Sequence, residues 1–132
     1  MKLIFDTHVL IWWFLAPDKL PSKFEAHISK VEKRNEQIGV SIISFWESGL
    51  LANLNRLHLT TSIHQWFEKL SREPLLEVLP LSGAVILESL SLGNKFPKDP
   101  ADRFIAATAR VYGLKLLTSD EAIRKSGQVV TL

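Results

Sequence analysis

Five acidic residues of this chain lie at positions where a predicted strand or loop passes into a predicted helix. These residues are Asp6, Glu47, Asp99, Asp102 and Asp120. A carboxylate at such a junction can cap a helix or interact with its positive end. It can also hold a hard divalent cation that activates water for attack on a phosphoryl group. Taken one at a time, the residues leave both interpretations open.

The clearest helix of the sequence begins at two of these acids. Asp99 suits the N-cap, Pro100 suits the first helical position, and Asp102 falls in the first turn. Gly113 can end the helix in a left-handed conformation. A buried face recurs at helical spacing through Ala101, Phe104, Ile105, Thr108, Val111 and Tyr112.

Glu47 has an equally local explanation. Ser44 and Glu47 form an S-x-x-E pattern, which is typical of a capping box at the start of a helix over 42–54. In this helix Phe45 and Trp46 are expected in the core. The pattern does not separate a capping role for Glu47 from a catalytic one.

Strands and helices alternate along the chain, which predicts an α/β fold with a central, mainly parallel sheet of four to five strands flanked by helices. The helix over 8–15 is apolar on nearly all sides, which favours core packing or contact with a partner chain. Ser119 is expected to cap the last helix. The strands are expected at 2–5, 37–41, 75–81, 114–118 and 128–132, and the helices at 8–15, 21–34, 42–54, 62–70, 82–92, 99–112 and 121–125.

Composition narrows the classes of function. The 132 residues suit a single domain, 1–132, and the absence of cysteine excludes a disulfide framework and a thiolate metal site. No apolar segment is long enough to cross a bilayer, so we expect a soluble, cytoplasmic protein. The net charge is +2, but if the five acids share one site, 14 − 5 leaves nine acids against sixteen Lys and Arg, a balance of +7 elsewhere. Such a surface suits a polyanionic substrate, although solvated lysines would give the same count.

In a parallel sheet the carboxyl ends of the strands meet at one edge, and ligands bind there. Carboxylates gathered at that edge repel one another unless a cation joins them. Mg²⁺ or Mn²⁺ would resolve the repulsion, and phosphodiester hydrolysis is the chemistry that such a centre supports. No pair of histidines has the spacing of a zinc site.

Four motifs in this order resemble the PIN-domain nucleases: Asp6-Thr7, Ser44-Phe45-Trp46-Glu47, Asp99-Pro100-Ala101-Asp102-Arg103 and Thr118-Ser119-Asp120. The segments Asp6-Thr7-His8 and D-P-x-D-R look most like the VapC-type toxins of bacterial toxin–antitoxin pairs. The resemblance covers essentially the whole chain. It implies a three-layer α/β sandwich and a Mg²⁺- or Mn²⁺-dependent endoribonuclease that acts on RNA, forms a homodimer and is held inactive by a cognate antitoxin.

The resemblance also implies roles for particular residues. Asp6, Glu47 and Asp102 match the principal acidic positions of the family, and Asp120 matches the more variable fourth one. Asp99, Thr7, Ser44 and Thr118 are expected to support these carboxylates or the substrate. Arg103 is expected either to steady the acidic cluster or to meet a phosphate.

Two other functions remain to be compared with the nuclease. A catalytically inactive PIN-like binding module would keep the fold and the helix caps and act only through protein partners. A phosphatase with an aspartyl nucleophile fits less well, because no second aspartate lies two residues after Asp6. Lys95 and Lys98 lie in a loop beside the helix that begins at Asp99. These lysines could contact the phosphate backbone of a nucleic acid or could simply be solvated.

Overall fold

A four-stranded parallel sheet forms the middle of the computed structural model, which describes residues 1–132. Its strands are β1 (Leu3–Phe5), β2 (Ile38–Ser41), β3 (Leu76–Leu79) and β4 (Lys115–Leu117). Their order across the sheet is β3-β2-β1-β4, and every pair is parallel. The sheet therefore confirms the expected α/β class.

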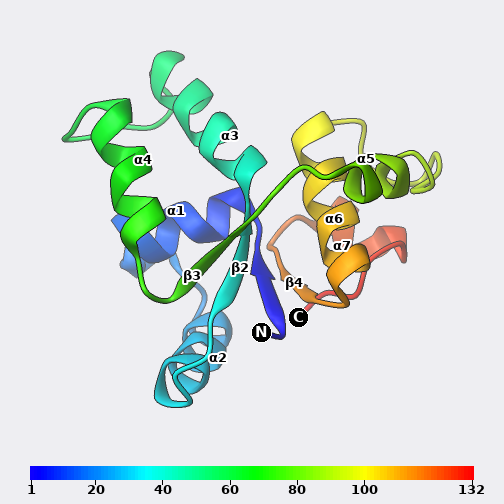
Figure 1. The fold of residues 1–132 in the computed structure, drawn as a ribbon, viewed down its shortest axis with the longest axis horizontal. Coiled ribbons are helices and arrows are strands. Elements are labelled where there is room, and N and C mark those ends of the chain that lie inside the picture. Colours follow the sequence, from blue (N-terminus) through cyan, green and yellow to red (C-terminus); the bar gives the residue numbers. More distant parts are fainter.

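Helices cover both faces of the sheet, which gives the expected three layers (Figure 1). Figure 1 shows α5, α6 and α7 on one side and α1 and α4 on the other, with α2 beside the amino ends of the strands. None of the helices could span a lipid bilayer. The helices are α1 (Thr7–Leu15), α2 (Ser22–Lys33), α3 (Ile42–Asn53), α4 (Ile63–Arg72), α5 (Gly83–Ser89), α6 (Pro100–Tyr112) and α7 (Glu121–Ser126), with a short 3₁₀ turn at Pro17–Lys19.

Side chains alternate along each strand, and this divides the core in two. Leu3 and Phe5 of β1 point into the larger cluster, which α1, α2, α3 and α4 complete. Ile4 points the other way, into a smaller cluster that includes Ile105 of α6 and Ile123 of α7. The central strands β1 and β2 are buried on both faces, as is typical of parallel sheets, whereas Glu77 of β3 and Lys115 of β4 are exposed on the two outer strands.

The strand order reverses direction at β1. The chain moves outward from β1 to β2 and β3, and then returns to place β4 on the opposite side of β1. In open α/β sheets, such a reversal leaves a crevice at the carboxyl ends of the two diverging strands. The residues that follow β1 and β4 therefore face one another across the position where a ligand is expected.

Helix α6 begins and ends as its sequence predicts. The Asp99 carboxylate accepts hydrogen bonds from the backbone N–H groups of Ala101 and Asp102 at 2.8 and 3.2 Å. Gly113 closes the helix with a φ of 67°, a left-handed conformation that suits glycine. Ala101, Ile105 and Thr108 of the predicted buried face are buried and Phe104 is half-buried, but Val111 and Tyr112 are exposed.

Two expectations near the carboxyl end of the chain are wrong. The segment 128–132 forms no strand, since its only pairing is a single bridge between Leu116 and Thr131. Asp120, rather than Ser119, caps α7: its carboxylate accepts hydrogen bonds from Ala122 and Ile123. Asp120 lies directly next to the first helical residue, which allows its side chain to reach these N–H groups.

Candidate metal centre

Asp6 ties three elements together at the carboxyl end of β1. Its side chain is almost fully buried, with 6% of its surface exposed. One carboxylate oxygen accepts a hydrogen bond from the backbone N–H of His8 at the start of α1, and the other accepts one from the Thr118 hydroxyl after β4, at 2.5 Å. Burial raises the pKa of Asp6 above its ordinary value, while these two hydrogen bonds act against that rise.

Three further carboxylates converge beside Asp6. Glu47 of α3, Asp99 and Asp102 can each offer an oxygen such that all three oxygens lie within 4.8 Å of one another. The packing of α3 against α6 brings them together. Residues separated by more than fifty positions in the chain therefore share one small acidic cluster, formed by Glu47, Asp99 and Asp102.

Glu47 is not part of a capping box, contrary to one of the two expectations for it. Ser41, the last residue of β2, caps α3 by accepting a hydrogen bond from Ile43 at 3.2 Å, because strand and helix follow one another with no linker. Ser44 is fully buried, and its hydroxyl contacts the Thr7 hydroxyl at 2.9 Å. Glu47 therefore does not cap this helix.

One oxygen of Glu47 is buried and has no hydrogen-bond partner. An unpartnered buried carboxylate oxygen is costly, so most proteins avoid it. Burial raises the pKa of Glu47; the nearby Thr7 hydroxyl opposes this rise, and the negative charges of Asp99 and Asp6 add to it. A helix end needs no such arrangement, but a cation site does.

Asp102 is both partly buried and repelled by the other four acids at this edge. Partial burial, together with the charges of Asp6, Asp99, Glu47 and Asp120, raises its pKa from an ordinary 3.8 to about 7. Asp99 already caps α6, so Asp102 is not needed for that purpose. A bound divalent cation would reverse the effect of these charges and keep all of the carboxylates ionised.

Asp120 lies at the same edge but outside the three-residue cluster. It is exposed and caps α7, and its negative charge contributes to the raised pKa values of Asp6 and Asp102. Its backbone N–H donates to the Thr118 hydroxyl, which in turn donates to Asp6. Thr118 thus connects the two acids that follow β1 and β4.

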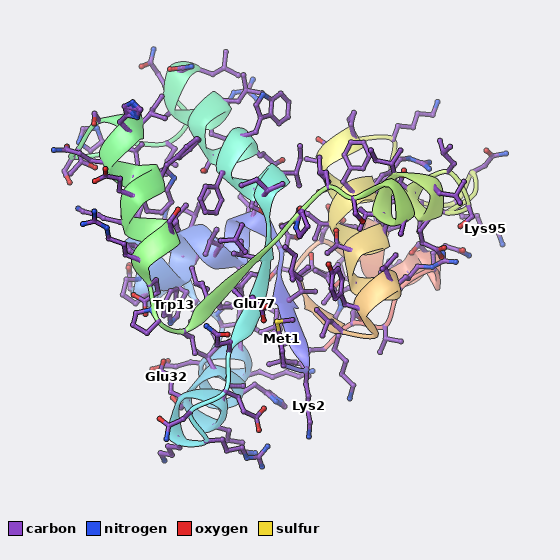
Figure 2. The ribbon with its side chains drawn as sticks, in the orientation of Figure 1. Met1, Lys2, Trp13, Glu32, Glu77 and Lys95 are labelled. Atoms are coloured by element: carbon purple, nitrogen blue, oxygen red, sulfur yellow. The ribbon has the colours of Figure 1, made fainter.

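The Arg103 side chain is directed to the loop that precedes α6 and not to the carboxylates. Its guanidinium donates to the backbone carbonyls of Gly93 and Phe96 at 3.1 and 3.2 Å and lies over the Phe96 ring. It forms no ion pair with any acid. Arg103 therefore holds the loop that precedes α6. Figure 2 shows that Lys95, in the same loop, is directed away from the sheet.

The side chains of Trp46 and His8 are both exposed. Trp46 was expected in the core, but 55% of its surface is exposed, because Phe45 takes the inward position of that turn. His8 belongs to the Asp6-Thr7-His8 motif, but the sequence assigned it no role. It is exposed beside the acids, and its Coulomb interaction with Asp6 and Glu47 lowers their pKa values. Its place directly after Asp6-Thr7, in the first turn of α1, was the signal that could have indicated this role.

The donor set fits a hard divalent cation. It consists of carboxylate oxygens alone, with no cysteine in the chain and no imidazole among the three converging groups. Mg²⁺ and Mn²⁺ prefer such oxygen ligands and use a few carboxylates together with water or phosphate oxygens. The unpartnered oxygen of Glu47 gives this fit its strongest support.

Comparison with known proteins places this geometry in a family. Residues 3–128 match the model of the PIN domain. The chain is 30% identical over 122 residues to ribonuclease VapC22 of Mycobacterium tuberculosis, which covers 92% of this chain and 89% of that protein.

Solved structures of low sequence identity share the fold. VapBC2 from Rickettsia felis, bound to a DNA fragment from its promoter, superposes with a TM-score of 0.73 at 14% identity, covering 100% of this chain and 98% of that one. FitAcB from Neisseria gonorrhoeae gives a TM-score of 0.72 at 20% identity, with 99% and 96% covered. The family match over nearly the whole chain, together with the mycobacterial relative, confirms the resemblance, and this protein belongs to the PIN-domain family.

Proposed function

We propose that this protein is a divalent-metal-dependent endoribonuclease and the toxin of a toxin–antitoxin pair. The observation that carries the proposal is the convergence of Glu47, Asp99 and Asp102, together with the buried carboxylate oxygen of Glu47 that has no hydrogen-bond partner. The 30% identical relative is named a ribonuclease, which supports RNA as the substrate. Cellular RNA as substrate would make the cytoplasm the place of action.

Glu47 and Asp102, together with Asp6, are the residues that we assign to Mg²⁺ or Mn²⁺, and Asp120 would act through water or at a second position. When bound, the ion would polarise a phosphoryl oxygen and lower the pKa of water near the scissile bond. The chain itself keeps the ligands in place: the Thr118 hydroxyl and the His8 N–H orient Asp6, and the Thr7 hydroxyl, which contacts the Ser44 hydroxyl, lies near Glu47. Asp99 is held by its capping bonds and adds negative charge at the rim.

The test is RNA cleavage by the Asp6→Asn and Asp102→Asn variants. We expect each to reduce the cleavage rate at least about 100-fold, since it removes a charged ligand while keeping the side-chain volume. The thermal midpoint without metal should stay the same or rise, because one of several repelling charges is lost. Asp18→Asn, on the exposed 3₁₀ turn, is the matched control and should cleave at the parent rate.

An Asp6→Asn variant that cleaves RNA as fast as the parent would refute the metal centre. Activity that survives EDTA in the parent would do the same. A folded parent that shows neither nuclease activity nor any response to divalent ions would instead support the inactive binding module. The unpartnered oxygen of Glu47 favours the nuclease, because a module that had kept only its helix caps would have no use for it.

Two exposed apolar surfaces support the proposed protein partners. A groove of about 360 Å³ runs between α3 and α4, and its lining includes Ile42, Trp46, Leu50, Ile63 and Phe67. We assign this groove to an apolar segment of the antitoxin, since several structural neighbours are toxin–antitoxin complexes.

The second surface lies on α5 and just beyond it, where Leu87 and Leu90 are 71% and 78% exposed. We assign it to the homodimer. Replacing both leucines by Asp should change the molar mass measured by light scattering from that of a dimer to that of a monomer. The variant should still unfold in one cooperative thermal transition, which shows that the monomer is folded. An unaltered molar mass would refute this assignment.

A further inference from the structure

A second charged region lies at the opposite edge of the sheet from the acidic cluster. A cavity of about 360 Å³ opens there between α2 and the amino ends of β1 and β4. Four of its lining residues are permanent cations and one is an acid: Lys2, Lys30, Arg34, Lys115 and Glu36. We call this the basic cavity. Figure 2 shows Lys2 at the amino end of β1, on the side of the molecule where α2 lies.

The cations of the basic cavity come from separate parts of the fold. Lys2 precedes β1, Lys115 begins β4, and the two residues are joined by the backbone bond from the Lys115 N–H to the Lys2 carbonyl at 2.9 Å. Lys30 and Arg34 belong to the last turn and the C-cap of α2. His27, one turn earlier on the same helix face, completes the lining on that side.

None of these four cations forms an ion pair, and Glu36 is the one acidic side chain of the lining. The two ion pairs of the structure join Arg110 to Glu88 and Arg124 to Glu121, so none of the four cavity cations lies within 4.0 Å of a carboxylate. The terminal Leu132 also lines the cavity, but the Arg124 guanidinium binds its carbonyl oxygen. The cavity therefore keeps a net positive charge.

The helix sequence shows the same lack of compensation. A solvated helix face commonly carries an acid three or four residues from each lysine. The residues at those distances from Lys30 are Ala26, His27, Lys33 and Arg34. Attraction to the negative end of the helix accounts for cations in the last turn of α2, but not for the convergence of Lys2 and Lys115 from the sheet.

From this arrangement we propose that the basic cavity is a phosphate-binding site, separate from the acidic cluster. Four cations around a concave space match a ligand with two or more phosphate charges, and arginine adds two parallel N–H donors suited to phosphate oxygens. The volume lies within the range of small-ligand pockets. The phosphates could belong to a free phosphorylated metabolite or to a distant part of the RNA strand, and these two sources make different predictions.

Distance separates this site from the metal centre. Lys2 and Asp6 lie at opposite ends of β1, about 13 Å apart at the usual rise of about 3.3 Å per residue. A phosphate in the basic cavity could not also contact the carboxylates. Binding here is therefore independent of the proposed nuclease activity, and it can be measured when no cleavage occurs.

The first experiment titrates inorganic pyrophosphate into the protein by calorimetry, in EDTA. Without metal the acidic cluster repels anions, so heat from binding reports the basic cavity. Lys30→Gln combined with Arg34→Gln should weaken pyrophosphate binding at least about 10-fold. The matched control is Lys69→Gln with Arg72→Gln, the same charge change in the last turn of α4, and it should change the affinity less than 2-fold.

We call Lys30→Gln with Arg34→Gln the cavity pair and Lys69→Gln with Arg72→Gln the α4 pair. A third variant tests whether the cavity pair weakens binding only because it disturbs the end of α2. Lys115→Gln, on the sheet side of the cavity, should also weaken pyrophosphate binding, with an unchanged thermal midpoint. If both pairs lose the same amount of pyrophosphate affinity, the binding is unspecific charge attraction and the proposal is overturned. A parent protein that binds no pyrophosphate would overturn it as well.

The second experiment identifies the source of the phosphates. A fluorescent 20-nucleotide single-stranded RNA is titrated in EDTA against Asp102→Asn with and without the cavity pair. If RNA supplies the phosphates, affinity falls about 10-fold and the slope of log K against log salt falls by about 1.4 for two lost contacts. If a free metabolite supplies them, RNA affinity stays within 2-fold while pyrophosphate binding is lost.

Discussion

The two edges of the sheet gather like charges in different surroundings. At the carboxyl edge Asp6 is buried and Glu47 and Asp102 are half-buried, whereas at the amino edge Lys2, Lys30, Arg34 and Lys115 are exposed. Coulomb repulsion is several times stronger in a partly buried site than in water. The acidic cluster is therefore destabilising until a counter-ion binds, and the basic cavity is not. Burial of the charge, rather than the number of charges, distinguishes the proposed metal centre from the basic cavity.

Glu47→Gln should have the largest effect of the variants considered. We expect RNA cleavage to fall at least about 100-fold, because the unpartnered oxygen is replaced by an amide that binds cations poorly. Without metal, the thermal midpoint should rise by a few degrees at pH 8, since one repelling charge is gone. Glu68→Gln on the exposed face of α4 is the control. Parent-level cleavage by Glu47→Gln would remove this residue from the site.

Divalent ions should stabilise the carboxyl edge alone. At 100 times the dissociation constant, a ligand of the folded state adds about 2.7 kcal/mol to the free energy of unfolding. For a chain of this size, we expect Mn²⁺ to raise the thermal midpoint by roughly 8–10 °C. The Asp102→Asn variant should lose most of that shift, while the Lys30/Arg34 pair should keep it. An equal shift in all variants would mean that the ion binds elsewhere.

The pH dependence of stability should come from the acids. The pKa of Asp102 is raised to about 7, so between about pH 4 and pH 7 the folded state binds more protons than the unfolded state. The free energy of unfolding of the metal-free protein should therefore fall as the pH rises through this window, and the loss should be complete above it. Asp6 and Glu47, whose pKa values are also raised, act in the same direction.

Asp102→Asn should flatten this profile. Melting curves in EDTA at pH 5 and pH 8 measure it: the drop in thermal midpoint between the two should be smaller in the variant by a few degrees. Lys69→Gln serves as a control for a charge change far from the cluster. Parallel profiles for parent and variant would show that the raised pKa has no thermodynamic consequence.

The smallest effect is expected at the amino edge. Lys30→Gln with Arg34→Gln removes exposed repulsion but also a favourable interaction with the end of α2, so the free energy of unfolding should change by less than about 0.5 kcal/mol. Urea denaturation measures it at low and at high salt. A loss of more than about 2 kcal/mol would mean that these cations support the fold, and the contrast between the two edges would disappear.

Local chemistry explains which parts of the fold could be predicted. Asp99, Pro100 and Gly113 act on neighbouring backbone groups, and they mark the ends of α6 correctly. The alternation of apolar strands with helices was enough to predict a parallel sheet between helical layers, because few other folds satisfy that pattern.

The errors arise where a distant partner decides between two local patterns. Ser44 and Glu47 fit a capping box, but Ser41 caps the helix, and Ser44 is used by Thr7 from α1. Trp46 is exposed because the rotation of α3 is set by its contacts with α1, α4 and α6.

The candidate site shows the same limit. The order of the strands brings the acids to one edge, which the sequence could indicate, but the separations among them depend on how α3 and α6 pack. The cluster of Glu47, Asp99 and Asp102 is such a separation, and no spacing along the chain encodes it. The basic cavity also escaped notice, since Lys2 and Lys115 become neighbours only when β1 and β4 pair.

The hydrogen bond between Thr118 and Asp6 joins residues 112 positions apart. A ribosome adds about 5–20 residues per second, so roughly 6–22 s pass between the synthesis of Asp6 and that of Thr118, whose hydroxyl orients it. β4, Asp99 and Asp102 are also synthesised long after Asp6. Until Thr118 has been added, the nascent polypeptide therefore lacks an assembled centre, and an RNA-cleaving chain of this design leaves the messenger and ribosome that produce it untouched for that time.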